Sequence, residues 1–176
     1  MPSASRRLAN RLARARYRVR QFTRGLRPIL TTVEIEAVRS HLTPAECALF
    51  LAAEGRDHRH SVDLFEALRA AGASRPELVA ALLHDVGKGR LRTWHRVAFV
   101  LIEACAPRLA RRVESISGAP WRQALWRLRH HARLGAAMLD VAGSDPRVIE
   151  LVAGHTEAPP ADDPVLARFI EFDDRL

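Results

Sequence analysis

The sequence predicts an all-α fold, because helix-start signals recur along the chain and no segment alternates like a strand. Capping boxes that contain a proline occupy residues 43–46 (Thr-Pro-Ala-Glu) and 74–77 (Ser-Arg-Pro-Glu). In this motif the Ser or Thr and Glu side chains satisfy backbone N–H groups that a helix N-terminus leaves free. Asp-Pro pairs at 145–146 and 163–164 mark two further helix starts.

The helices are predicted in order from these starts and from apolar residues at helical spacing. In the first half of the chain we expect a helix from 44 to about 54, one from 57 to 71 ended by Gly72, and one after Ser74 that carries His84 and Asp85. An amphipathic stretch from 93 to about 114 and a helical region from Pro120 that breaks near His130 are expected next. A helix from 146 to 155 and a last one opened by Asp163 complete the prediction. Residues 157–163 are expected to form a surface loop.

Charge divides the chain into two parts. The 176 residues carry a formal net charge of +8, yet residues 1–28 hold nine Arg and no acidic residue, so the remainder is nearly neutral. We therefore expect a basic, helical N-terminal extension over residues 1–30 and one helical domain over 31–176. The extension could be a solvated or docked helix, a segment that binds anionic membrane or nucleic acid through residues 1–28, or an organellar transit peptide.

Cysteine content and hydropathy favour a cytoplasmic location, with peripheral membrane attachment through the basic segment as an alternative. Cys47 and Cys105 lie in apolar helical surroundings, which is typical of buried free thiols in a reducing compartment. The longest apolar stretch, residues 97–106, is too short to cross a bilayer and contains an acidic residue.

His84 and Asp85 follow the apolar run Leu-Val-Ala-Ala-Leu-Leu at 78–83. A helix so apolar on most of its surface should be buried. An imidazole and a carboxylate at its end are costly unless they pair with each other or bind a metal ion. Adjacent helical positions diverge by about 100°, so joint coordination requires the helix to end there, and Gly87 supplies the break. A buried His–Asp hydrogen bond is the alternative.

Other histidines and carboxylates stand where helical periodicity brings them toward the core. His155 continues the apolar stripe of 148, 151 and 152, although a core histidine without a ligand role would show the same pattern. His131 precedes Gly135 by one turn, and the glycine permits close approach of another element. The orientation of His60 is ambiguous. In the last helix periodicity does not choose between Asp173 and Asp174.

These residues together resemble the HD superfamily of metal-dependent phosphohydrolases. The family's pattern is a His, a His-Asp pair and a distal Asp, all on helices. His60 resembles the first His, and Leu-Leu-His-Asp-Val-Gly-Lys at 82–88 resembles the surroundings of the pair. The stretch Phe-Ile-Glu-Phe-Asp-Asp at 169–174 resembles the closing pattern, and its register selects Asp174. The resemblance covers roughly residues 40–176 and implies a single HD-domain bundle. The chain length and the typical size of a helix predict about six to eight helices.

Two further positions resemble subfamilies that hold two metal ions. His131 opens a His-Ala-Arg-Leu-Gly-Ala segment, and His155 stands where those relatives read His-His-Glu, with Thr156 replacing the second His. The resemblance thus implies a metal-ligand set of His60, His84, Asp85, His131, His155 and Asp174. Imidazole and carboxylate ligands without thiolate suit Mn, Fe, Co or Zn, as one or two divalent ions.

The expected activity is metal-dependent hydrolysis of a phosphoester, in a nucleotide or a related phosphorylated small molecule. Asp85 would help hold the attacking water. Lys88, the only lysine of the chain, would contact the substrate phosphate, or would simply be a cation at a helix end. Arg92 and His95 could bind the substrate, or could lie at a solvated helix start. The alternative function is a non-catalytic HD scaffold whose Arg-rich N-terminus binds nucleic acid or anionic membrane.

Overall fold

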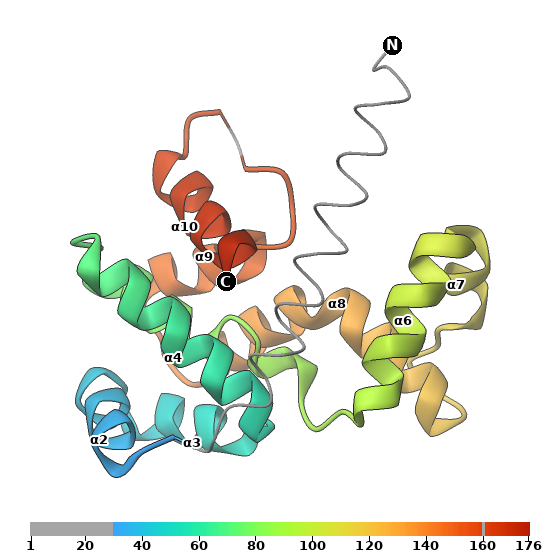
Figure 1. Cartoon of the computed structure of the whole chain (residues 1–176), viewed down its shortest axis with the longest axis horizontal. Coiled ribbons are helices and arrows are strands. Elements are labelled where there is room, and N and C mark those ends of the chain that lie inside the picture. Colours follow the sequence, from blue (N-terminus) through green and yellow to red (C-terminus); the bar gives the residue numbers. More distant parts are fainter. Residues whose placement is uncertain (1–29, 160) are drawn as a thin grey trace.

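The computed structural model describes residues 30–159 and 161–176, and this part of the chain contains helices and no strand. The predicted all-α fold is thereby confirmed (Figure 1). Nine α-helices form in the described residues, more than the six to eight expected. They are α2 (Thr32–His41), α3 (Pro44–Ala52), α4 (Gly55–Ala70), α5 (Arg75–Leu83), α6 (Thr93–Cys105), α7 (Pro107–Val113), α8 (Pro120–Val141), α9 (Pro146–Gly154) and α10 (Pro164–Arg175), with a 3-10 turn, η1 (Val86–Lys88), after α5. The Arg-rich segment lies outside the described residues, so the predictions made for it stay predictions.

The capping boxes form as the sequence predicts. Thr43 Oγ1 accepts a hydrogen bond from the Glu46 N–H, and the Glu46 carboxylate accepts one from the Thr43 N–H. The same reciprocal pair joins Ser74 and Glu77 at the start of α5. Helix α2 was not predicted, yet Thr31 and Glu34 make a third box of this kind. Each box depends on four neighbouring residues, which is why it can be recognised without knowledge of the fold.

Two of the predicted helix boundaries are wrong. The expected stretch from 93 to 114 is two helices, because a proline at 107 disfavours helical conformation at Ala106, where φ is −147° and ψ is 66°. The expected break near His130 does not occur, and α8 continues through it for 22 residues. No proline follows Pro120 within α8, so every backbone N–H around His130 can stay in the helical ladder.

The main core lies among α4, α5, α9 and α10, with α2 and α3 packed against one side. Helix α5 is buried along most of its length, as expected for its apolar run. Its neighbours contribute the fully buried rings Phe50, Phe65 and Phe169. The His-Asp pair at the end of α5 is therefore placed in the centre of the bundle.

Helices α6 and α7 stand apart from this core at the other side of the molecule, and α8 connects the two regions (Figure 1). The C-terminal half of α8 adds Leu139 to the main core. Ala124 and Leu128 of its N-terminal half form a small separate cluster with Leu91, and Phe99 of α6 packs against this cluster. Helix α6 itself has no buried residue.

No described helix is both long enough and apolar enough to span a membrane. Both cysteines are free thiols, but Cys47 is only half-buried and Cys105 is exposed, so the expectation that both would be buried is wrong. Cys105 is the last residue of α6, the helix that lies outside the main core.

Candidate metal centre

The chain changes direction at the His-Asp pair. His84 is the C-terminal cap of α5, and Asp85, with φ −99° and ψ 0°, is the N-terminal cap of the 3-10 turn η1. Gly87 lies in this turn directly against α8. A Cβ atom on Gly87 would stand 2.0 Å from the carbonyl oxygen of His131 and 2.6 Å from the backbone nitrogen of Gly135. The predicted helix break and the predicted close approach at Gly135 are both present, and together they bring His131 against the motif.

A first group of possible metal ligands consists of His60 from α4, His84 and Asp173 from α10, whose ligand atoms all lie within 4.8 Å of one another. The Nε2 atom of His60 is 2.8 Å from Asp173 Oδ1, and the Nε2 atom of His84 is 3.6 Å from the same oxygen. Burial alone would lower the pKa of His60, but the hydrogen bond and charge of Asp173 outweigh it, so this pKa is raised.

A second group consists of Asp85, His131 from α8 and His155, which follows α9. Asp85 Oδ1 is 3.4 Å from His131 Nε2 and 4.0 Å from His155 Nε2. The other oxygen, Oδ2, is 3.5 Å from His84 Nε2. Asp85 therefore stands between the two groups, with one oxygen facing each.

The imidazoles are oriented by backbone carbonyls. Nδ1 of His84, His131 and His155 lies 3.0, 2.8 and 2.7 Å from the carbonyl oxygens of residues 81, 128 and 152 respectively. Carbonyls only accept, so each Nδ1 carries the proton and, in the neutral ring, Nε2 presents a lone pair. Such a hydrogen bond from Nδ1 commonly fixes the ring orientation of a metal-binding histidine.

The second group has the electrostatics of a cation site. Burial, together with Lys88, lowers the pKa of His131 to about 3, and burial together with His84 lowers that of His155 to about 4, so both rings are neutral. Their Nε2 lone pairs then face each other at 3.2 Å. Asp85 Oδ1 is buried and accepts no hydrogen bond from any described residue. Although burial raises the pKa of Asp85, electrostatic interactions with the neighbouring His84 and Lys88 lower it well below its usual value, so the carboxylate is ionised. These donors fit a divalent metal ion.

The register that selected Asp174 is corrected by the structure, which brings Asp173 to His60 and His84. Phe169 is the fully buried residue of α10, and its ring lies 6.3 Å from that of His84, centroid to centroid. Asp173 follows Phe169 by four positions and so shares its face. Asp174 is exposed.

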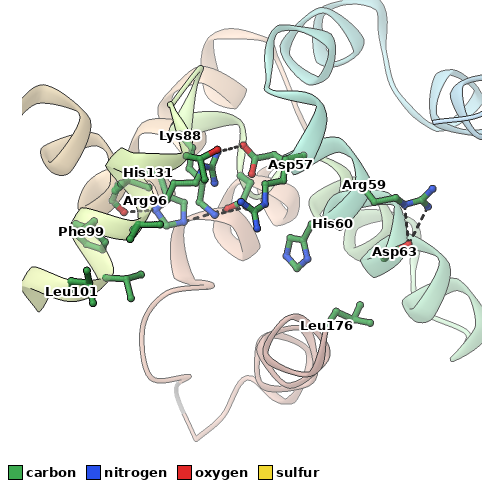
Figure 2. Close-up of a pocket in the computed structure, with 16 residues that line it drawn as sticks. Asp57, Arg59, His60, Asp63, Lys88, Arg96, Phe99, Leu101, His131 and Leu176 are labelled. Atoms are coloured by element: carbon green, nitrogen blue, oxygen red, sulfur yellow. Dashed lines mark hydrogen bonds and ion pairs between the residues drawn. The ribbon is translucent and has the colours of Figure 1, made fainter. Parts of the chain in front are cut away.

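A pocket of about 340 Å³ opens beside both groups, and His60, Asp85 and His131 line it (Figure 2). Its volume lies in the range of small-molecule sites. Lys88 also lines it, with Nζ 2.5 Å from Asp85 Oδ2, and its contact with a substrate phosphate stays a prediction.

Arg92 and His95 do not reach this pocket. Arg92 is exposed, and His95 packs its ring against Trp94 with centroids 4.0 Å apart. Arg96 lines the pocket instead and pairs with Asp57 at 2.6 Å. Neither Arg92, the N-cap of α6, nor His95 in its first turn lines this pocket, so their role in substrate binding stays a prediction.

Sequence reasoning identified Lys88 but missed the three arginines of the pocket. Arg56 and Arg59 of α4 and Arg96 of α6 line it, and burial and the charge of Arg96 lower the pKa of Arg56. A signal for Arg56 was available, since it precedes His60 by four positions and helical periodicity puts both on one face. Arg96 could have been found only by knowing which face of α6 meets the pocket.

The model of the HD domain family matches residues 57–176, which is most of the chain. The chain therefore belongs to the HD domain family, whose members are generally metal-dependent phosphohydrolases, and the resemblance read from the motifs is confirmed. The match begins within α4, so it includes every residue of both ligand groups. No curated protein and no solved structure matches the chain.

Proposed function

We propose that this protein is a metal-dependent phosphohydrolase that cleaves a phosphoester of a small molecule in the pocket beside Asp85. The observation that carries the proposal is the convergence of two ligand groups on Asp85, whose Oδ1 is buried without a hydrogen-bond partner among the described residues. A buried carboxylate facing two neutral imidazoles is costly unless a cation joins them.

Two ions are proposed, one held by His60, His84 and Asp173 and the other by Asp85, His131 and His155. Asp85 would contribute to both, because its Oδ2 faces the first group at 3.5 Å from His84 Nε2. The nitrogen and oxygen donors favour Mn, Fe, Co or Zn. When bound, such ions lower the pKa of water and neutralise charge that develops on the phosphoryl oxygens. Thr156, where some relatives have a further histidine, leaves the second group with three protein ligands, which is enough for an open catalytic site.

The surrounding residues would supply the remaining functions. Asp85, which stays ionised, can orient a water molecule by accepting its hydrogen bond at Oδ1. Lys88 can transfer its hydrogen bond from Asp85 to a phosphate oxygen without moving far, since it already lies between the carboxylate and the pocket. Arg56 and Arg96 add positive charge at the pocket wall and would attract a phosphorylated substrate.

The proposal is tested by elemental analysis of purified protein, followed by a phosphatase screen over nucleotides and other phosphomonoesters with Mn²⁺, Co²⁺ and Fe²⁺. Asp85→Ala should lose bound metal and lower kcat at least about a thousandfold, while helical circular dichroism is retained. Asp140→Ala, an exposed carboxylate on α8, is the matched control and should behave like the unaltered protein. A protein that neither contains metal nor gains it from Mn²⁺ contradicts the proposal.

A further inference from the structure

One face of α6 is directed at the pocket instead of at the core. Thr93, Arg96, Val97, Val100 and Leu101 line the pocket and recur at i, i+3, i+4, i+7 and i+8, the spacing of a single helix face. Val97 is 47 % and Leu101 57 % exposed, and no residue of α6 is buried. Apolar helix faces in soluble proteins normally pack on the core, so this one has the character of a binding surface.

The apolar face of α6 and the two ligand groups line opposite ends of one pocket. Figure 2 shows Phe99 and Leu101 of α6 on one side, with His131 and Lys88 between them and His60. Leu128 of α8 and Leu176 at the end of the chain extend the apolar lining. A ligand anchored at the metal groups through a phosphate would therefore lay its remaining part against α6.

The polar lining of the pocket is almost entirely charged or imidazole. Among its lining residues in the described part of the chain, Thr93 is the one neutral side chain with a hydroxyl or amide group. Four of the charged lining residues already have partners, since Arg59 pairs with Asp63 at 3.0 Å and Arg96 pairs with Asp57. Sugar hydroxyls and nucleobase edges need hydrogen-bond partners when they are buried, and the α6 side of the pocket offers few from side chains.

We propose that the substrate is a phosphate ester of an apolar alcohol, with its phosphate at the metal groups and its hydrocarbon part on the α6 face formed by Val97, Val100 and Leu101. This inference rests on the proposed phosphohydrolase function and specifies its substrate class. Water adds its oxygen to phosphorus, the bond from phosphorus to the ester oxygen breaks, and the leaving alkoxide takes up a proton, giving inorganic phosphate and the free alcohol.

The test uses the full metal-loaded protein and a series of n-alkyl phosphates from ethyl to hexyl, with nucleoside 5′-monophosphates for comparison. Each methylene that becomes buried should raise kcat/KM about fourfold. Leu101→Asn should flatten this dependence on chain length. The control Leu109→Asn changes a leucine of similar exposure, 52 %, on α7 outside the pocket, and should leave the dependence unchanged.

A binding measurement gives a second readout that needs no turnover. Hexylphosphonate, which is not hydrolysed, should bind more tightly than ethylphosphonate by calorimetry, with a negative heat-capacity change that Leu101→Asn reduces. Three results would overturn the proposed substrate class without contradicting the phosphohydrolase function. They are a rate that does not depend on chain length, faster cleavage of nucleotides than of hexyl phosphate, and equal effects of the two Asn variants. A dimer that Leu101→Asn dissociates would show instead that a second copy covers the α6 face. Failure of metal binding would remove the proposed function as well.

Discussion

At the scale of single residues, the two ligand groups can be tested separately by changing a histidine that belongs to only one of them. His131 belongs to one group and His60 to the other. His131→Asn should lower the metal content from about two ions to about one, because the His60 group keeps all its ligands. His130→Asn is a close control, since His130 neighbours His131 on α8 but packs its ring, tilted by 38°, against Trp126 with ring centroids 4.7 Å apart. Elemental analysis of both variants decides the matter, and loss of metal in His130→Asn would mean that the two groups are misassigned.

Gly87 is the second residue at which a single substitution should have a large effect. Its missing Cβ leaves space for the His131 carbonyl, which a methyl group would meet at 2.0 Å. The obstacle is backbone, so it cannot move aside as a flexible side chain could. Gly87→Ala should lower the free energy of unfolding by about 3 kcal/mol or more and weaken metal binding by displacing α8. Gly55→Ala, where nothing lies within 4 Å of the added atom, should change neither by much. Urea unfolding of both variants checks this, and similar midpoints would contradict the close packing.

The residues that sequence analysis identified are those with a signal in their own neighbourhood. The placement of His84 and Asp85 followed from an apolar run that ends in two polar residues, and His155 from an apolar stripe. Asp173 and Asp174 could not be separated in that way, because each continues an apolar residue of α10 by one turn. Burial decides between them, since Phe169 is fully buried whereas Ile170 is half-buried. That difference depends on packing against α4 and α5, which no local pattern contains.

At the scale of elements, Glu77 connects the start of α5 to α10. Its carboxylate caps α5 through Ser74 and accepts hydrogen bonds from Arg168 of α10, while the side chain is almost fully buried. Burial acts to raise the pKa of Glu77, but the bonds from Ser74 and Arg168 outweigh it, so the pKa is lowered. The ionised form is therefore more favoured in the folded than in the unfolded chain.

The sign of the pH dependence follows from this lowered pKa. The contribution of Glu77 is present above its unfolded pKa of about 4.3 and is lost as pH falls through its lower folded value. Glu77→Gln should reduce the free energy of unfolding by about 2 kcal/mol at neutral pH. The difference between the variant and the unaltered protein should shrink in acid. Urea unfolding across pH 7 to about 3 measures it, and a difference that is constant with pH would contradict an ionic role.

Helix boundaries were predictable where the cause is local. The capping boxes at 43–46 and 74–77 and the starts at Asp145 and Asp163 form as expected. The division of α6 from α7 at Ala106 also has a local cause, the following proline, and the sequence analysis passed over it because the apolar pattern continues across the site. That α6 packs on so little of the core has no local cause, since its sequence is as amphipathic as that of a buried helix.

At the scale of the whole molecule, the site exists only because distant segments meet. Its ligands come from α4, the end of α5, α8, the end of α9 and α10, separated by as many as 113 residues, as in the contact from His60 to Asp173. Nothing in the spacing of these residues along the chain places them in space. Their resemblance to the HD pattern supplied that information, and the fold provides its physical basis, the buried α5 with helices packed on either side.

Metal binding should consequently stabilise the entire bundle. A ligand that binds only the folded chain adds about 4 kcal/mol at a free concentration one thousand times its dissociation constant. For a domain of this size each kcal/mol raises Tm by about 2–4 °C, so saturating Mn²⁺ should raise Tm by about 10 °C, and chelation should reverse the change. Asp85→Ala should abolish the shift, because its carboxylate faces both groups, whereas His131→Asn should retain part of it. Scanning calorimetry with and without Mn²⁺ measures these shifts, and an equal shift in Asp85→Ala would place the stabilising ion somewhere other than at the His-Asp pair.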